Sequence, residues 1–375
     1  MFIMENWIQK MPKLGFGMMR LPQNAGTIDM DKVCNMVDSY MEHGLNYFDT
    51  AYVYHGGMSE AAIKEALVKR YSREDFYIAT KLPAWEMKEQ ADCDRIFAEQ
   101  LDRTGTDYFD FYLLHSLEDG KNYETYEKYN CFEWAMKKKE EGKIRHFGFS
   151  YHGSPELLIK VLDKHPEVEF VQIQLNYADW DNPVVQSGKL YQILHEREIP
   201  IIVMEPVKGG TLANMEPKLE NMMKAVNPTK TIASWALRFV GSLEGIMTIL
   251  SGMSTEEQML DNLQTFTQFQ PLNGEEYKVV ASVVKEMQDM PLIPCTGCRY
   301  CVDGCPSGIL IPDIFRAVNT KRLYPMDARP GMFYQNMTAN SGKAADCISC
   351  GQCEGVCPQH LPVIELIREA SEKFD

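Results

Sequence analysis

Two runs of four cysteines near the end of this 375-residue chain constrain its fold more than any other feature. Each run has the spacing C-x2-C-x2-C-x3-C and is followed by proline. In this spacing three thiolates surround one [4Fe–4S] cluster, and the fourth reaches a second cluster. The pattern therefore predicts two clusters with crossed ligands. The predicted ligand sets are Cys295, Cys298, Cys301 and Cys357 for one cluster, and Cys305, Cys347, Cys350 and Cys353 for the other.

Two other interpretations of the cysteines fit less well. Structural zinc sites usually show paired C-x2-C knuckles separated by a longer loop, which these tight runs lack. Disulfides are the weaker alternative, because the segment MFIMENWIQKMPK has no apolar region or cleavage site of a secretory signal. No apolar stretch approaches the length of a membrane span either. We therefore expect reduced thiols and a cytoplasmic protein.

The composition limits the classes of partner. The formal net charge is −15, from 53 acidic and 38 basic residues, which argues against nucleic acid or an anionic membrane, since both attract a basic face. The length fits one large and one small domain. The segment MPLIPC (290–295) contains two prolines, which disfavour a helix across it. We therefore expect one domain over 1–290 and a second over 291–375.

The first 290 residues alternate short apolar runs with amphipathic segments. The apolar runs show little period-2 alternation, which is typical of buried parallel strands. The predicted strands are Leu14–Leu21, Leu45–Asp49, Phe76–Lys81, Phe109–His115, His146–Ser150, Glu169–Gln174, Ile201–Glu205 and Gly245–Ser251. The predicted helices lie over 30–43, 59–70, 92–104, 124–141, 155–164, 184–197, 229–240 and 255–266. Eight such pairs predict a (β/α)8 TIM barrel, followed by a small, mainly α-helical, ferredoxin-like domain.

Polar side chains lie at or near the ends of the predicted strands. Active sites of such barrels form at the carboxyl ends of the strands, so these side chains are expected to share one opening. They are Asp49, Lys81, His115, Ser150, Gln172, Gln174 and Glu205. The glycine Gly252 follows the last predicted strand in the same way. Any one of them alone is weak support, because a single Asp after a strand is more often a turn residue.

The chemistry of four residues then suggests a reaction. Asp49 and Lys81 come from adjacent strands and can form an ion pair, and Tyr54 lies on the loop after Asp49. A nearby ammonium group is expected to lower the pKa of the Tyr54 phenol from about 10. His115 can donate to a carbonyl oxygen and orient it. This set of groups suits the reduction of a carbonyl by hydride, with Tyr54 as the proton donor.

Residues about 13–270 resemble the aldo-keto reductase superfamily. The motifs that carry the resemblance are LGFGMMRLP (14–22), NYFDTAYVY (46–54), IATK (78–81), DFYLLHS (110–116), GKIRHFGFS (142–150), VQIQLN (171–176) and SGMSTEEQMLDN (251–262). The resemblance implies a catalytic tetrad of Asp49, Tyr54, Lys81 and His115, and NAD(P)H lying across the barrel mouth. It also implies a set of cofactor-binding residues. They are Ser150 and Gln172 at the carboxamide, Met204 at the nicotinamide face, and Gly252, Gln258 and Asn262 at the pyrophosphate and adenosine.

Three departures from the family pattern matter. Tyr151 and His152 follow Ser150 where the family often has Asn, and Met204 stands where a Tyr often stacks on the nicotinamide. Members that use NADPH place Lys and Arg around the adenosine 2′-phosphate, but the matching positions here are Gly252 and Gln258. Neither can neutralise a phosphate that carries nearly two negative charges. We therefore expect NADH to be preferred over NADPH.

Residues 291–375 resemble the α-helical ferredoxin module that some aldo-keto reductases of anaerobic bacteria carry. Three functions follow. The first is hydride transfer between NAD(P)H and a carbonyl or alcohol, with structural or docking clusters. The second is electron transfer to or from a partner protein, which needs a flavin or a partner as converter, and barrels can bind a flavin without a motif. The third is a non-catalytic barrel that serves as a docking platform.

The substrate loops carry little information. Four aromatic residues lie near the predicted barrel mouth, and each could line it or cover the core. They are Tyr52, Trp85, Tyr177 and Trp180. An aromatic and largely neutral pocket would suit an apolar or cyclic carbonyl compound.

Overall fold

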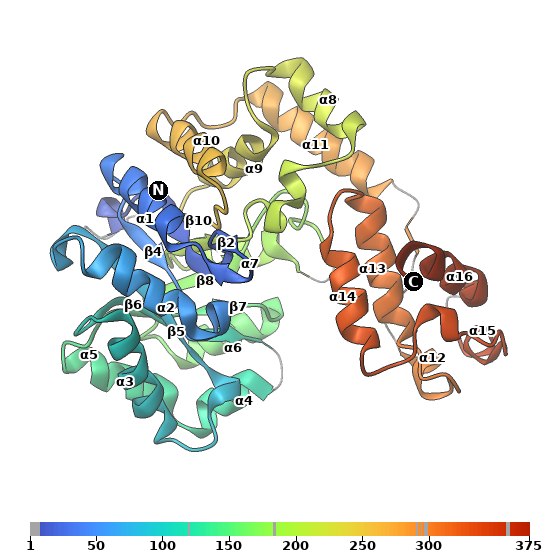
Figure 1. Ribbon diagram of the computed structural model, residues 1–375, viewed down its shortest axis with the longest axis horizontal. Coiled ribbons are helices and arrows are strands. Elements are labelled where there is room, and N and C mark those ends of the chain that lie inside the picture. The colour runs from blue at the N-terminus through green and yellow to red at the C-terminus, as the bar shows by residue number, and fades with distance from the viewer. Residues whose placement is uncertain are drawn as a thin grey trace. The chain divides into compact units, whose positions relative to one another are not determined.

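The structure is a computed structural model that describes residues 8–118, 121–182, 185–289, 292–293, 295, 299–357 and 361–375. The chain forms two compact units. The first comprises Met1–Gly209 and Ala233–Asn273, and the second comprises Gly210–Ile232 and Gly274–Asp375. In Figure 1 the first unit runs from blue to yellow, and the helices of the cysteine region are orange to red.

Eight parallel strands close into a barrel in the first unit, in the spatial order β1-β10-β9-β8-β7-β6-β5-β4. The strands are β1 Leu14–Gly17, β4 Tyr47–Asp49, β5 Tyr77–Pro83, β6 Phe109–Leu117, β7 Ile144–Tyr151, β8 Phe170–Gln174, β9 Ile201–Met204 and β10 Ile246–Ser251. Most strand residues are buried on both faces, as expected for a parallel sheet that is covered by helices. The predicted (β/α)8 fold is confirmed.

Helices follow the barrel strands along the chain and have recognisable start signals. Ser154 and Thr255 cap α6 and α10 through side-chain oxygens, and Pro155 occupies the first position of α6. The helices of this region are α1 Met30–Glu42, α2 Met58–Ile63, α3 Asp92–Thr104, α4 Lys121–Lys128, α5 Cys131–Glu140, α6 Pro155–Lys164, α7 Ser187–Glu196, α9 Ile232–Gly241 and α10 Glu256–Thr267.

Some predicted boundaries were wrong. The single helix expected over 124–141 is two helices, because Asn130 has a φ of 49°, a left-handed conformation that interrupts α-helical hydrogen bonding. The first strand ends at Gly17 instead of Leu21, and a 3₁₀ turn, η2 Met18–Arg20, follows it. A small hairpin, β2 Gln23–Asn24 with β3 Thr27–Ile28, was not predicted.

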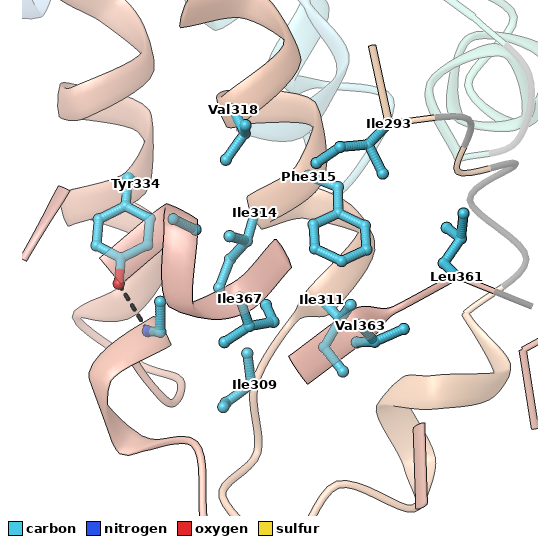
Figure 2. Close-up of a cluster of buried hydrophobic side chains, with 12 residues drawn as sticks. Ile293, Ile309, Ile311, Ile314, Phe315, Val318, Tyr334, Leu361, Val363 and Ile367 are labelled. Carbon is cyan, nitrogen blue, oxygen red and sulfur yellow. Dashed lines mark hydrogen bonds between the residues drawn. The ribbon is translucent and has the colours of Figure 1, made fainter. Parts of the chain in front are cut away.

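The second unit is mainly helical, as expected. Its remaining elements are α8 Pro217–Val226, α11 Gly274–Gln288, α12 Tyr300–Asp303, α13 Ile311–Leu323, α14 Arg329–Thr338, η8 Ala344–Asp346, α15 Gln352–Gly355 and α16 Val363–Phe374. Figure 2 shows its apolar core, in which Ile314, Phe315 and Val318 of α13 pack with Val363 and Ile367 of α16. Of the helices described, none is both long and apolar enough to cross a membrane.

The domain boundary expected at residue 290 does not coincide with the division into units. Helices α8 and α11 belong to the second unit, where Lys218 of α8 pairs with Glu286 of α11. The buried carboxylate of Glu276 in α11 also accepts a hydrogen bond from Asn227, just after α8. The boundary between a barrel domain over 1–290 and a ferredoxin-type domain over 291–375 stays a prediction.

Candidate active site and cysteine clusters

The barrel brings the four residues of the predicted tetrad to one end of adjacent strands. Asp49 ends β4, and Lys81 and His115 lie near the ends of β5 and β6. The parallel register aligns Lys81 with Leu113 and Pro83 with His115. Tyr54 opens the short 3₁₀ turn η3 Tyr54–Gly57 on the loop after β4. All four therefore lie at the carboxyl face, as a barrel active site requires.

Asp49 and Lys81 form a buried ion pair. The Lys81 Nζ is 2.7 Å from Asp49 Oδ1 and also donates to the Thr50 carbonyl at 2.7 Å. Both side chains are almost fully excluded from solvent. Burial raises the pKa of Asp49 although Lys81 acts in the opposite direction. Burial alone would lower the pKa of Lys81, but Asp49 and Tyr54 outweigh it and raise that pKa, so the ammonium stays charged.

Tyr54 lies against the charged end of Lys81 and is partly exposed. The Lys81 Nζ is 5.0 Å from the centre of the Tyr54 ring. The expected lowering of the Tyr54 pKa was wrong in its net direction. Burial raises this pKa by more than Lys81 lowers it, and the charge of Asp49 adds to the rise. The phenol therefore holds its proton at neutral pH, as a proton donor must.

His115 lies beside Tyr54 and is kept neutral. The two rings meet edge to face with centroids 5.9 Å apart, and the ring of Trp85 is 5.0 Å from that of His115. Burial lowers the pKa of His115 well below its ordinary value, and the nearby Lys81 and His152 add to this effect. The buried Nδ1 of His115 has no hydrogen-bond partner. A neutral imidazole has one N–H, which can donate to a substrate oxygen.

Ser150 and Gln172 form a polar pair on neighbouring strands, in register with each other on β7 and β8. Ser150 Oγ accepts from the Ser116 N–H at 2.8 Å, so the hydroxyl keeps its own hydrogen for donation. Gln172 Nε2 contacts Met204 Sδ at 3.5 Å, while its buried Oε1 has no partner. A buried acceptor without a partner is costly, so it indicates a missing donor. A carboxamide NH₂ group, such as that of nicotinamide, fits this place.

The other three predicted cofactor residues lie after β10. Gly252 directly follows the strand, and a Cβ added there would be 3.3 Å from Arg20 Cδ. Gln258 is exposed in the first turn of α10, and its Oε1 accepts from the Ser254 N–H. Asn262 is buried and donates to Ser251 Oγ at 2.8 Å. Gln258 and Asn262 thus form hydrogen bonds with the segment at the end of β10. Gly252 has no side chain and leaves space beside Arg20.

Arg20 lies beside the predicted cofactor residue Gly252 and was not singled out by the sequence analysis. It lies in η2, directly after β1, and its guanidinium is 3.9 Å from Glu205, the residue that follows β9. Its position after a barrel strand was the available signal, because the same rule identified Asp49 and His115. Arg20 thus brings a guanidinium group close to Gly252.

The structure shows which of the four aromatic residues near the predicted mouth are exposed there and which pack inside the protein. Trp85 is 47% exposed and packs against His115, so it lies at the mouth. Tyr177 is buried and packs edge to face on Phe239, and Trp180 packs on the same ring. Tyr52 is held by hydrogen bonds and a stacked arginine. Trp85 is therefore the one of these four placed to meet a substrate.

Short contacts join the two cysteine runs in the second unit. The Gly342 N–H donates to the Gly308 carbonyl at 3.1 Å, and Ser307 Oγ donates to the Asp346 carbonyl at 2.7 Å. These bonds bring the segment after Cys305 beside the segment that leads into Cys347. A Cβ on Gly342 would lie 2.0 Å from the Ser307 carbonyl oxygen, so this approach requires glycine.

The joined segments surround a hollow lined by Cys305, Cys347, Cys350 and Cys353. These are the four cysteines of the second predicted ligand set, which come from both runs. No disulfide joins any cysteine that the structure describes. Within the described residues, no three Cys, His, Asp or Glu side chains are arranged to hold a single metal ion. Four thiols around a shared space fit a polynuclear cluster better than a single zinc ion.

The other predicted ligand set is described only in part. Cys295, Cys301 and Cys357 pack against the apolar core of the second unit. Cys298 lies outside the described residues. The structure therefore brings the second set together and leaves the first as a prediction.

Comparisons with known proteins agree with this architecture. Residues 13–285 match the profile of the "Aldo/keto reductase family", and residues 294–362 match that of the "4Fe-4S dicluster domain". The chain is 26% identical over 306 residues to the uncharacterized oxidoreductase YqkF of Bacillus subtilis (strain 168), covering 73% of this chain and 93% of that protein.

Two further similarities concern an enzyme and a solved structure. The chain is 25% identical over 287 residues to L-galactose dehydrogenase of Arabidopsis thaliana, covering 71% of this chain and 88% of the dehydrogenase. The structure of the aldo-keto reductase AKR11C1 from Bacillus halodurans, in its holo form, matches with a TM-score of 0.58 at 26% identity. That match covers 72% of this chain and 91% of the other. Each of these similarities covers roughly the barrel part of the chain.

Proposed function

This chain belongs to the aldo/keto reductase family and carries a 4Fe-4S dicluster domain, and we propose that it reduces a small carbonyl compound by hydride transfer, with Tyr54 as the proton donor. The observation that carries the proposal is the contact of Lys81 with Asp49 at 2.7 Å and with the Tyr54 ring at 5.0 Å. This arrangement places a protonated phenol beside a fixed cation at the barrel mouth. The reverse reaction, oxidation of an alcohol, uses the same groups.

Each residue has a distinct part in the reaction. A reduced nicotinamide supplies the hydride when it is bound. The substrate carbonyl oxygen accepts a hydrogen bond from the neutral His115, which orients it toward Tyr54. The Tyr54 hydroxyl then donates its proton to the developing alkoxide. The charge of Lys81 stabilises the phenolate that remains, and Asp49 holds Lys81 in place.

Replacement of Tyr54 by Phe tests this role. General acid catalysis typically contributes about 10²–10⁴-fold, so Tyr54→Phe is expected to lower kcat by that factor while NADH binding is retained. The measurement is loss of NADH absorbance with a panel of aromatic and cyclic aldehydes and ketones. Turnover by Tyr54→Phe at the parent rate would overturn the assigned role. Under the docking-platform alternative, neither the parent nor Tyr54→Phe would turn over a carbonyl compound.

We propose that Ser150, Gln172 and Met204 hold the nicotinamide and that NADH is preferred over NADPH. The unpartnered Gln172 Oε1 supports the first part. Glu256 and Glu257 in the first turn of α10, beside the uncharged Gln258, support the second, because they would repel a 2′-phosphate. Titrations that monitor NADH and NADPH fluorescence compare the two dissociation constants. Tighter binding of NADPH would contradict this preference.

The cysteine-lined hollow supports electron transfer through the clusters as a second candidate function. Cys350 is exposed, so a cluster that it ligates would lie near the surface, where one-electron partners can approach. Anaerobic electron paramagnetic resonance spectra would be recorded with NADH, with NADPH and with a strong reductant as control. Cluster reduction by a nicotinamide would favour this function and call for a flavin assay. Reduction by the strong reductant alone would mean that the clusters are structural or are reduced by a partner protein.

A further inference from the structure

The loop that carries Tyr54 has little regular structure to hold it. Tyr54 opens the short turn η3, and His55, Gly56 and Gly57 all have positive φ values. Within the loop, the Tyr54 N–H donates to the Ala51 carbonyl at 3.1 Å. A loop of this kind adopts one position only if contacts from neighbouring elements fix it. The catalytic distance between Tyr54 and Lys81 therefore depends on those contacts.

Helix α3 holds this loop through Tyr52, two residues before Tyr54. Arg103 Nη1 donates to the Tyr52 carbonyl at 3.2 Å, and the guanidinium lies over the Tyr52 ring at 4.1 Å. The Tyr52 hydroxyl donates to Glu99 Oε2 at 2.6 Å. Both the main chain and the ring of Tyr52 are thus attached to one turn of α3.

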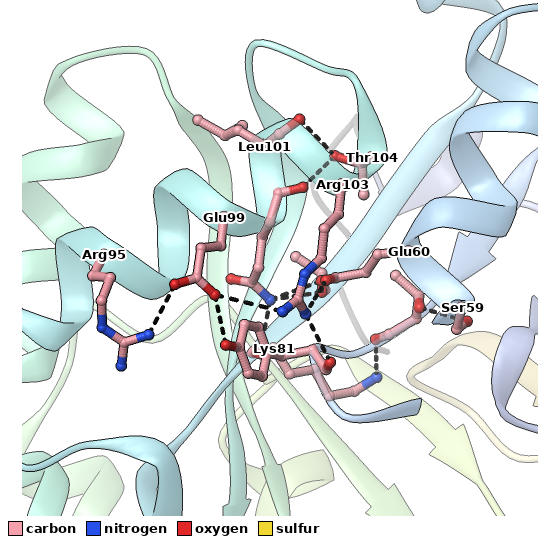
Figure 3. Close-up of polar contacts among 12 residues, drawn as sticks. Ser59, Glu60, Lys81, Arg95, Glu99, Leu101, Arg103 and Thr104 are labelled. Atoms are coloured by element: carbon pink, nitrogen blue, oxygen red, sulfur yellow. Dashed lines mark hydrogen bonds and ion pairs between the residues drawn. The ribbon is translucent and has the colours of Figure 1, made fainter. Parts of the chain in front are cut away.

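The same turn of α3 holds the strand end that carries Lys81. Gln100 Nε2 donates to the Lys81 carbonyl and to Thr80 Oγ1, each at 3.0 Å. Figure 3 shows Glu99 and Arg103 on this face, with Lys81 and Glu60 beside them. Because Glu99, Gln100 and Arg103 lie within one helical turn, their relative positions are fixed by the helix.

Glu60 closes the network. Its side chain is fully buried, and Oε1 accepts from Thr80 Oγ1 at 2.7 Å and from Gln100 Nε2 at 2.9 Å. Its Oε2 lies 3.4 Å from Arg103 Nη1. Arg103 therefore neutralises a buried carboxylate and fixes the Tyr52 main chain with the same nitrogen atom. Because the Glu60 carboxylate is buried, removal of Arg103 should cost more stability than removal of one partner of an exposed surface ion pair.

We infer that Arg103 is a positioning residue, which acts through Tyr52 to hold Tyr54 against Lys81. The inference rests on the proposed role of Tyr54. Misplacement of a catalytic group by about 1 Å can cost about 10²-fold in rate. Arg103→Gln is therefore expected to lower kcat by about 10- to 100-fold, with an unchanged NADH dissociation constant. Arg103→Lys keeps the charge but not the planar fork, so it restores only part of the rate.

The barrel offers a matched control. Arg73 makes the same three kinds of contact as Arg103: it pairs with the buried Asp110 at 2.6 Å, lies over the Tyr108 ring at 3.9 Å and donates to the Tyr108 carbonyl at 3.1 Å. These contacts lie at the amino-terminal ends of β5 and β6, away from the active site. Arg73→Gln should therefore destabilise the barrel without a selective loss of kcat.

The experiment compares Arg103→Gln, Arg73→Gln, Tyr54→Phe and the double variant Arg103→Gln/Tyr54→Phe. Each is measured with 4-nitrobenzaldehyde and NADH, and by hydrogen exchange over residues 50–57. We expect faster exchange and a lower kcat in Arg103→Gln than in the parent. We also expect the double variant to have the same kcat as Tyr54→Phe. Equal effects of Arg103→Gln and Arg73→Gln on kcat and exchange would overturn the inference. A fully active Tyr54→Phe would overturn the proposed function, while the exchange data would still test the contact.

Discussion

In the barrel the reactive side chains are held by other side chains of the protein, whereas in the cysteine region they surround a space that the protein leaves open. Lys81 is fixed by Asp49 and by the Thr50 carbonyl, inside a closed ring of strands. Cys305, Cys347, Cys350 and Cys353 line a hollow on the edge of a small core. In the first site the protein itself holds the charged groups in place, whereas in the second the four thiols share a space.

This difference follows from the size of the two cores. The barrel buries most residues of its eight strands on both faces, which gives it a large apolar core. The core beside the cysteines contains twelve buried residues among those described, and small cores of this kind usually need a metal or another cross-link. The binding free energy of a cluster therefore contributes directly to the folding of this region.

Cluster removal should have the largest effect and should separate the two regions. Protein prepared without iron is expected to lose protected amides over 299–357 and 361–375, because the small core loses its cross-links. NADH binding and hydrogen exchange over the barrel strands should stay unchanged. Hydrogen exchange with mass spectrometry measures both regions in one sample. Full protection of the cysteine region without iron would show that its core folds unaided.

Asp49→Asn should have a large effect confined to the barrel. Removing one partner of a buried ion pair typically costs about 3–5 kcal/mol, because it leaves an uncompensated charge, here that of Lys81. Urea unfolding monitored by barrel tryptophans measures this loss. The cluster absorbance of iron-loaded protein should be unaffected before the barrel unfolds. A cost below about 1 kcal/mol, the range of exposed pairs, would contradict the buried geometry.

Gly342→Ala should have a smaller effect, confined to the cysteine region. The added methyl would meet the Ser307 carbonyl at 2.0 Å, so the two cysteine segments must separate. Overpacking of this kind typically costs about 1–3 kcal/mol. We expect fewer irons per chain, determined by chemical assay. Gly331→Ala in α14, where a Cβ has nothing within 4 Å, is the control and should keep its iron. Equal iron in both variants would argue against the tight approach.

The sequence predicted those parts of both sites that depend on spacing along the chain. The alternation of apolar runs located the eight strands, and the strand ends located Asp49, Lys81 and His115. The cysteine spacing predicted that Cys305 shares a cluster with the second run, and in the structure Cys305 lines one hollow with Cys347, Cys350 and Cys353. These features depend on local periodicity and on ligand spacing, which are visible in one dimension.

Features that depend on the three-dimensional surroundings were not predictable in the same way. The net direction of the Tyr54 pKa depends on how far burial outweighs Lys81, which needs the folded environment. The network of Arg103, Tyr52 and Glu60 joins residues that are far apart in sequence and have no motif spacing. The sequence therefore left open whether Tyr52 lines a pocket or packs in the core, whereas in the structure Glu99 and Arg103 of α3 hold it.

Acidification should distinguish the parent protein from His55→Gln by the smallest of these effects, because His55 is one of several histidines whose pKa is lowered by burial. The Leu21 N–H donates to His55 Nε2 at 3.2 Å, which requires a neutral ring, and burial lowers the pKa of His55. A lowered histidine pKa gives stability that is present above about pH 6.5 and is lost as the pH falls through the folded-state pKa. His55→Gln keeps an acceptor that does not titrate, so its unfolding free energy should fall less between about pH 7.5 and pH 5.5, by about 1 kcal/mol or less. Urea unfolding of the barrel measures this difference, and His115, whose pKa burial also lowers, should contribute equally in parent and variant. If the two proteins lost stability in parallel, the loop would be held by the α3 contacts alone and the imidazole would have no part in it.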